Sequence, residues 1–362
     1  MPLKIHTNLK YLTGNVMPIT MLDPLWPGHS FENETLYNLQ GNRLNRYQKV
    51  FYEIFEIVDI ESADFAVFPI AWELSRSEEG TRKLGEMREI ALKHNKKLIV
   101  FVGGDLQPKL PFDDLIVFHT SLISSLRKKN EFGMPALIED LIEHHYEDNF
   151  ITRDWVAKPS IAFCGTALPL KMPLGFKKIK EGGRFLLYKW GFLKLRPQSV
   201  GYAPRVRAIL KLQKSSKVTG NIIIRSSSPM IWAYGFLLNK GNCNTEALRS
   251  EYLENIKSSD YVLCVRGNGN YSIRLYEALC MGRIPVIVNT GVVLPFEGHL
   301  PWKDFCVWVE EKEIDKIDEK ILAFHNKFRG KSFSLLQKSC RNFWINWLSA
   351  EGFFLNFHTQ IS

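Results

Sequence analysis

Long hydrophobic runs, a signal-peptide core and close cysteine pairs are all missing from this sequence. No stretch of about 18 consecutive apolar residues occurs, so we expect no transmembrane helix. The first residues, MPLKIHTNLKYLTGN, contain no apolar segment of the kind that a secretory signal needs. The six cysteines are scattered, several of them inside apolar runs, which favours buried thiols over disulfides. We therefore expect a cytoplasmic protein.

Motifs for metals and for common nucleotide cofactors are missing or incomplete. The sequence has no CxxC pair, no close His/Cys cluster and no Asp-x-Asp pair, so we expect no bound metal. The best glycine turn, at 267–272, follows the pattern GxGxxS, which is an incomplete dinucleotide fingerprint and also lacks the Lys-Ser/Thr ending of a P-loop. An NAD-dependent dehydrogenase or epimerase is therefore the weaker enzyme hypothesis.

Acidic residues are scarce in one part of the chain. The net charge is +9, and the segment Lys171–Lys217 holds thirteen Lys or Arg residues against the single acidic residue Glu181. Aromatic residues are interleaved in GRFLLYKWGFLKLR, which allows a peripheral contact with a membrane surface or with an anionic glycan. The alternative is a solvated basic face whose aromatic residues lie in the core. We expect no nucleic-acid partner, because no nucleic-acid motif is present.

Strands and helices alternate along the chain, which predicts an α/β fold with doubly wound parallel sheets. Apolar runs predict strands at 3–6, 64–70, 97–102, 115–118, 159–165, 221–224, 261–265, 285–288 and 305–309. Helical patterns fill the intervals, including one at 121–130. The pattern breaks near 150–159, so we divide the 362 residues into domains 1–155 and 156–345 and a tail 346–362.

One predicted βαβ unit, residues 260–291, carries most of the recognisable chemistry. Between its first strand and its helix lies a turn, Arg266-Gly267-Asn268-Gly269-Asn270, made of residues that tolerate positive φ. The helix is expected to begin at Ser272, which places Arg274 in the first turn, where the helix dipole disfavours a cation unless an anion joins it. We predict a phosphate site here.

Glu277 lies three residues after Arg274 and should share a helix face with it. A carboxylate in that position could accept hydrogen bonds from the hydroxyl groups of a ribose. The alternative for this pair is a surface ion pair beside an ordinary βα turn.

The run SDYVLCVRGNGNYSIRLYEALCMGRIPVIVNT resembles the C-terminal signature of the exostosin-like glycosyltransferases. In that family a strand ending in Arg-Gly leads to Ser-x-Arg-x-x-Glu-Ala-Leu and then to Gly-x-Ile-Pro-Val. The resemblance implies a GT-B fold, in which two Rossmann-like domains face a cleft and the terminal helix crosses back onto the N-terminal domain. It identifies Arg266, Ser272, Arg274 and Glu277 as donor-site positions.

The same resemblance implies an activity. An inverting glycosyltransferase of this kind moves a sugar from a nucleotide-sugar, most simply UDP-linked, to a glycan or lipid-linked glycan acceptor in polysaccharide or glycoconjugate synthesis, without a cofactor or bound metal. Eukaryotic exostosins are usually anchored Golgi proteins, so we expect a bacterial or viral type of relative, in the cytoplasm or peripheral at the inner face of the membrane. The alternative is a catalytically inactive relative that binds glycan or lipid.

Two further residues of the C-terminal half are donor-site candidates. Gly165 follows the first strand of that half and would lie at the floor of the cleft, or else simply form a tight βα turn. Arg225 ends the strand at 221–224, where an arginine can bind a diphosphate. Family members often have an arginine after this strand, although pairing with a neighbouring carboxylate is the alternative for Arg225.

An inverting transfer needs a base that accepts the proton of the acceptor hydroxyl. Asp105 is the first candidate, because Gly103-Gly104-Asp105 follows a buried strand at the sheet edge where open α/β sheets bind ligands. The family has a similar Gly-Gly-Asp-like element. An Asx turn or a helix N-cap is the alternative role for Asp105. His6, at a strand end, and Asp23 are the other candidates, and a lone histidine is more often structural.

Overall fold

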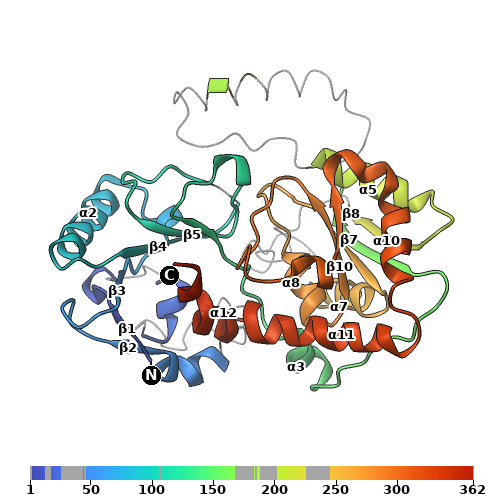
Figure 1. Ribbon diagram of the computed structural model, residues 1–362, viewed down its shortest axis with the longest axis horizontal. Helices are drawn as coiled ribbons and strands as arrows, with labels where there is room; N and C mark the ends of the chain where they lie inside the picture. Colours follow the sequence, from blue (N-terminus) through green and yellow to red (C-terminus); the bar gives the residue numbers. More distant parts are fainter. Residues whose placement is uncertain are drawn as a thin grey trace.

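Two parallel sheets, each flanked by helices, lie side by side in the computed structural model of the protein (Figure 1). The structure describes residues 2–12, 18–25, 44, 46–105, 107–167, 183, 186–187, 202–225 and 245–361. Most of the basic segment at 171–217 therefore lies outside the described residues, and the hypothesis that it contacts a membrane stays a prediction. Within the described ranges no helix is long and apolar enough to cross a membrane.

The N-terminal sheet is six-stranded and entirely parallel, in the order β2-β1-β3-β4-β5-β6. Its strands are β1 Leu3–His6, β2 Phe55–Ile57, β3 Phe65–Val67, β4 Leu98–Val102, β5 Ile116–His119 and β6 Glu131–Gly133. Every residue of β4 and β5 is buried, which explains their unbroken apolar runs in the sequence. Helix α2, Glu78–Lys93, begins at Ser77, whose hydroxyl accepts a hydrogen bond from the Gly80 amide.

The C-terminal sheet is five-stranded and parallel, in the order β11-β10-β9-β7-β8. Its strands are β7 Ser160–Thr166, β8 Thr219–Arg225, β9 Tyr261–Cys264, β10 Ile284–Asn289 and β11 Val307–Glu310. Further α-helices among the described residues are the one at 46–54 and α3 Leu141–Tyr146, α5 Tyr202–Gln213, α7 Thr245–Lys257, α8 Ile273–Cys280, α9 Trp302–Phe305, α10 Ile317–His325, α11 Lys331–Phe343 and α12 Ala350–Asn356. The α/β fold with two Rossmann-like sheets is thus confirmed.

The end of the chain crosses from the C-terminal domain to the N-terminal one, as the family resemblance implies. In Figure 1 the chain leaves the C-terminal domain along α11, and α12 and the C-terminus lie beside the N-terminal sheet. Phe353 and Phe357 place their rings 5.9 and 5.6 Å from that of Phe118 in β5. Phe354 lies 6.3 Å from Phe55 of β2. These buried aromatic contacts attach the terminal helix to the core of the N-terminal sheet.

Two details of the predicted organisation need comment. The helix predicted at 121–130 is wrong, because only a short 3₁₀ turn, Ser124–Leu126, forms there before β6 begins. Ile123 instead pairs with Val292 of the C-terminal domain, and this tertiary contact overrides the local helical preference. Helix α3 packs in the C-terminal core although it precedes the domain boundary placed at 155, and that boundary stays a prediction.

Candidate active site

The predicted donor turn connects the buried strand β9 to helix α8. Within it, the Arg266 guanidinium donates a hydrogen bond to the Asn268 carbonyl at 3.0 Å, which closes the turn. Ser272 occupies the N-cap position of α8, as predicted, with an extended backbone and no capping bond from its side chain. Its hydroxyl has no hydrogen-bond partner among the described residues. A cavity of about 20 Å³, enough for roughly one water molecule, lies beside Arg266 and Ser272.

Arg274 is buried, with 9% of its surface exposed, and turns toward the end of β7. Its Nε and Nη2 atoms donate hydrogen bonds to the Cys164 carbonyl at 3.2 and 2.6 Å. The guanidinium carbon lies 4.8 Å from the ring centre of Phe163 and 5.8 Å from that of Tyr252. In the part of the chain described, no carboxylate forms an ion pair with Arg274. Because a buried cation without a countercharge is costly, this arrangement favours an anionic ligand.

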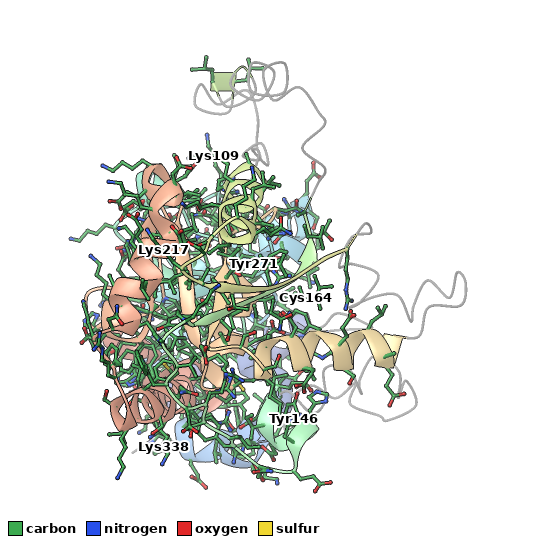
Figure 2. All side chains as sticks on the ribbon, turned by 90° about the vertical axis from the view of Figure 1, so that its right-hand side faces the viewer. Lys109, Tyr146, Cys164, Lys217, Tyr271 and Lys338 are labelled. Carbon is green, nitrogen blue, oxygen red and sulfur yellow. The ribbon has the colours of Figure 1, made fainter. Side chains whose placement is uncertain are left out.

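Gly165 lies against Arg274, so the structure brings these two predicted residues together. The φ angle of Gly165 is +155°, and a Cβ atom on it would lie 2.2 Å from Arg274 Nη2. Only glycine allows the guanidinium to approach the β7 backbone this closely. Figure 2 shows Cys164, near the end of β7, and Tyr271, which follows the donor turn, toward the middle of the molecule.

Replacing Gly165 with alanine should displace Arg274 and weaken the binding of UDP, the expected nucleotide, by at least about ten-fold, or about 1.4 kcal/mol. Calorimetric titration with UDP measures this effect. Gly85→Ala in α2 is the matched control, because its new Cβ would have an ordinary nearest contact of 3.5 Å, with the Phe112 ring. Equal UDP affinities for the two variants would show that the contact between Gly165 and Arg274 does not matter for the site.

Arg205 is a residue of this site that the sequence did not single out. It is 5% exposed and donates hydrogen bonds to the carbonyls of Thr166 at 3.0 Å and Val265 at 3.1 Å. It therefore joins the carboxyl ends of β7 and β9 directly beneath the donor turn. A Cβ atom on Gly267 would lie 3.1 Å from Arg205 Nη2, so the donor turn packs against the Arg205 side chain. Arg205 stands at the start of a predicted helix, but nothing in the sequence distinguishes it from the many other basic residues of 171–217.

Arg225 ends β8, as predicted, and is paired with Thr166 of β7. Its guanidinium, however, forms an ion pair with a carboxylate. Its Nη2 atom donates to the Leu248 carbonyl at 3.3 Å and to the Glu251 carboxylate of α7. This is the ion pair that the sequence left open as an alternative. A role for Arg225 in binding the donor stays a prediction.

Glu277 lies inside the C-terminal domain, with 4% of its surface exposed. It accepts a hydrogen bond from the Tyr252 hydroxyl, and its other oxygen lies 3.6 Å from Arg249 Nη1. Burial raises the pKa of Tyr252 well above its usual value, and the neighbouring Glu277 raises it further. The carboxylate is thus engaged by two protein groups, and contact with a ribose stays a prediction.

Of the three candidate bases, Asp105 is the one that the structure places against the donor turn. A Cβ atom on Gly269 would lie 2.8 Å from Asp105 Oδ1, so the side chain of the N-terminal domain touches the turn of the C-terminal domain. The carboxylate of Asp23 accepts a hydrogen bond from Gln48 at 3.4 Å, and His6 Nδ1 lies 3.1 Å from the Val58 carbonyl. Both of these contacts are within the N-terminal domain.

Comparison with known proteins matches part of the C-terminal half of the chain to a family. Residues 233–323 match the exostosin GT47 domain. A probable glucuronosyltransferase of Oryza sativa subsp. japonica is 42% identical over 67 residues, which cover 18% of this chain and 16% of the relative. A probable β-1,4-xylosyltransferase of Arabidopsis thaliana is 40% identical over 67 residues, with the same coverage. The matched region therefore spans only a small part of each relative.

The solved structures to which the chain aligns have low TM-scores and share little sequence with it. A glycosyltransferase from Rickettsia africae aligns over 99% of this chain and 97% of its own, with a TM-score of 0.35 and 11% identity. A variant of TarM from S. aureus, in complex with fondaparinux, alpha-GlcNAc-glycerol and UDP, aligns over 82% of this chain and 55% of its own, with a TM-score of 0.34 and 13% identity. The resemblance carried by the donor turn and α8 is confirmed by the sequence match, because residues 233–323, which include both, are similar to the exostosin GT47 domain and to glycosyltransferases.

Proposed function

We propose that the chain is a glycosyltransferase that moves a sugar from a UDP-linked donor to a glycan acceptor. The observation that carries this proposal is Arg274, a buried cation without a carboxylate partner in the described chain, at the N-terminus of α8 and against the end of β7. A nucleotide diphosphate supplies the countercharge that this position calls for. The relatives are named as glucuronosyl- and xylosyltransferases, and both sugars are commonly activated as UDP-sugars.

The reaction is a single displacement at the anomeric carbon of the donor. The acceptor hydroxyl oxygen forms a bond to that carbon, while the bond to the diphosphate breaks and its electron pair leaves with the diphosphate oxygen. The hydroxyl proton passes to a base, and the configuration at the anomeric carbon inverts. Arg274, Arg266 and the amides at the start of α8 stabilise the charge that develops on the leaving group. Because these positive groups are fixed, we propose that the reaction needs no metal.

Asp105 is the proposed base, and Asp105→Asn tests it. Asparagine keeps the size of the side chain but cannot accept the proton, so UDP affinity should stay within about two-fold while transfer falls by about 100-fold or more. Measuring UDP binding by titration and UDP release by a coupled assay separates the two effects. Wild-type transfer by the variant would remove Asp105 from the mechanism.

A thermal-shift panel of UDP, GDP, CMP, TDP and NAD, each with and without a divalent metal, tests the function as a whole. A ligand at about 100 times its dissociation constant stabilises a protein by roughly 2.7 kcal/mol, which the panel resolves. We expect selective stabilisation by UDP, unchanged by EDTA. Stabilisation by NAD alone would contradict a glycosyltransferase, and no response to any nucleotide would favour a relative that binds glycan without catalysis.

A further inference from the structure

The two domains are joined at the site by hydrogen bonds between the segments that follow β5 and β10, each of which is one strand from an edge of its sheet. Residues 121–124 follow β5 in the N-terminal domain, and residues 290–293 follow β10 in the C-terminal domain. We call these two segments the seam. The Ser124 amide donates to the Gly291 carbonyl at 2.9 Å, the Val293 amide donates to the Leu122 carbonyl at 3.4 Å, and Ile123 and Val292 form an antiparallel bridge.

Asn270, the last residue of the donor turn, lies at the centre of the seam and is 1% exposed. Its backbone amide donates to the Ser121 hydroxyl at 2.7 Å. Its Nδ2 group donates to the carbonyls of Leu122 at 3.1 Å and Gly291 at 3.0 Å. Its Oδ1 atom accepts from the Thr290 hydroxyl at 2.7 Å. One side chain amide thus uses its donor and acceptor groups to connect the donor turn to both domains.

The neighbouring residue, Gly269, sets how closely Asp105 approaches the same turn. The position of a Cβ atom on Gly269 would be 2.8 Å from Asp105 Oδ1 and 2.9 Å from Asp105 Cα, so a larger residue would push Asp105 away. Asn270 therefore anchors the turn to the N-terminal domain, and Gly269 allows the proposed base to lie against it. Asp105 itself follows β4, which pairs with β5, the strand that leads into the seam.

We propose that Asn270 is a positioning residue that holds the donor turn at a fixed distance from Asp105. This inference rests on the proposed function, because it concerns the placement of the base relative to the leaving diphosphate. A displacement of about 1 Å between reacting groups can lower a rate by about 100-fold. Loss of the anchor is therefore expected to affect turnover far more than affinity.

The test compares Asn270→Ala and Gly269→Ala with wild type. Release of UDP from UDP-glucuronate and UDP-xylose should fall by about 100-fold in both variants, while the dissociation constant for UDP changes by less than about three-fold. Gly269→Ala removes none of the hydrogen-bonding groups of Asn270, and its new Cβ atom would lie 2.8 Å from Asp105 Oδ1 and from Tyr271 Cε1, so it tests the spacing between the turn and Asp105 even if Asn270→Ala does not fold. Gly85→Ala serves as the control and should retain wild-type turnover. Wild-type turnover in Asn270→Ala, or equal losses of turnover and UDP affinity in the two site variants, would overturn the proposal.

Hydrogen–deuterium exchange supplies a readout that does not depend on activity. Amides of 121–124 and 290–293 should exchange at least about ten-fold faster in Asn270→Ala than in wild type, because the anchor no longer limits opening of the seam. Unchanged exchange would contradict the anchoring role even if wild type neither binds UDP nor turns over a UDP-sugar. If wild type neither bound UDP nor turned over a UDP-sugar, the proposed function would be wrong, whatever the exchange rates showed about the seam.

Discussion

Replacing Arg274 with alanine is expected to abolish transfer and to weaken UDP binding by at least about 100-fold, or about 2.7 kcal/mol. The guanidinium is buried and forms no ion pair with a carboxylate in the described chain, so its charge is available to a diphosphate. Charge-assisted hydrogen bonds to phosphate are among the strongest in proteins. Because no carboxylate of the described residues pairs with Arg274, its removal leaves no buried carboxylate unpaired there, so the melting temperature of the free protein should be unchanged or slightly raised.

Two further variants sharpen this prediction. Arg274→Lys retains the charge but loses the planar fork, so UDP binding should fall to an intermediate value. Arg207→Ala removes the same charge from an exposed position, where the side chain pairs with Asp315 at 3.4 Å and is 47% exposed. It should bind UDP as wild type does. If Arg274→Ala and Arg207→Ala bind UDP equally well, the donor site is not where we place it.

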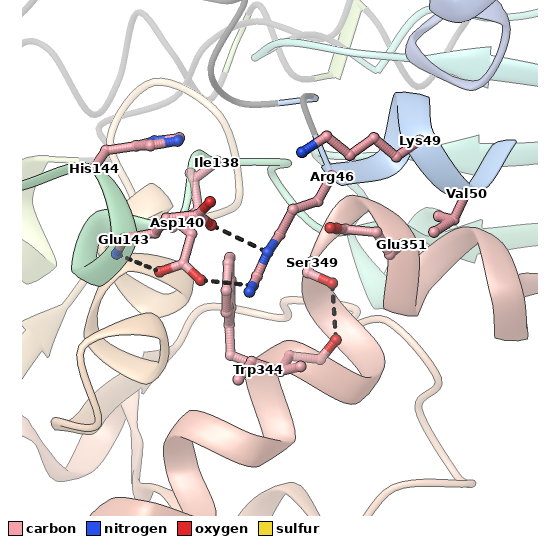
Figure 3. A pocket seen from close by; sticks show the side chains of 11 residues that line it. Arg46, Lys49, Val50, Ile138, Asp140, Glu143, His144, Trp344, Ser349 and Glu351 are labelled. Atoms are coloured by element: carbon pink, nitrogen blue, oxygen red, sulfur yellow. Dashed lines mark hydrogen bonds and ion pairs between the residues drawn. The ribbon is translucent and has the colours of Figure 1, made fainter. Parts of the chain in front are cut away.

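Replacing Asp140 with alanine is expected to cost about 3–5 kcal/mol of unfolding free energy, the largest loss of stability among the variants considered. Asp140 is 5% exposed, and its Oδ1 atom caps α3 by accepting hydrogen bonds from the amides of Ile142 and Glu143 at 3.1 and 3.3 Å. Its Oδ2 atom lies 2.5 Å from Arg341 Nη2. The same atom lies 3.2 Å from Arg46 Nη1 (Figure 3). The variant uncaps α3 and leaves the Arg341 cation buried without this partner.

The network around Asp140 connects three parts of the chain at the edge of a cavity of about 450 Å³ (Figure 3). Arg46 comes from the helix at 46–54 in the N-terminal domain, Asp140 from the connection between the sheets, and Arg341 from α11. Arg46→Ala is the matched control, because this side chain is 51% exposed and an exposed ion pair contributes about 1 kcal/mol or less. Denaturant unfolding measures both variants. Equal losses of unfolding free energy for Asp140→Ala and Arg46→Ala would show that the buried pair of Asp140 and Arg341 is not what stabilises the fold here.

The sequence predicts the local geometry of the site well, because that geometry depends on one βαβ unit. The turn, the helix start at Ser272 and the first-turn position of Arg274 all follow from residues adjacent in the chain. The approach of Gly165 to Arg274 depends on pairing between β7 and β9, which are far apart in the sequence. Only the resemblance to a known family placed Gly165 and Arg274 near the same ligand.

Contacts between distant segments were beyond sequence reasoning. The contact of Asp105 with Gly269 depends on how the two domains meet, which no local pattern records. The same junction explains the wrong helix at 121–130, since Asn270 and Val292 hold that segment in an extended form. Arg205 was missed because its partners, Thr166 and Val265, are far away in the sequence.

Calorimetric titration of the wild-type protein with UDP and, separately, with uridine tests the central claim most directly. The claim is that the donor turn, Arg274 and the start of α8 recognise a diphosphate. We therefore expect UDP to bind at least about 100-fold more tightly than uridine, with the same result in EDTA. Equal affinities for the two ligands, or no binding of UDP, would contradict it.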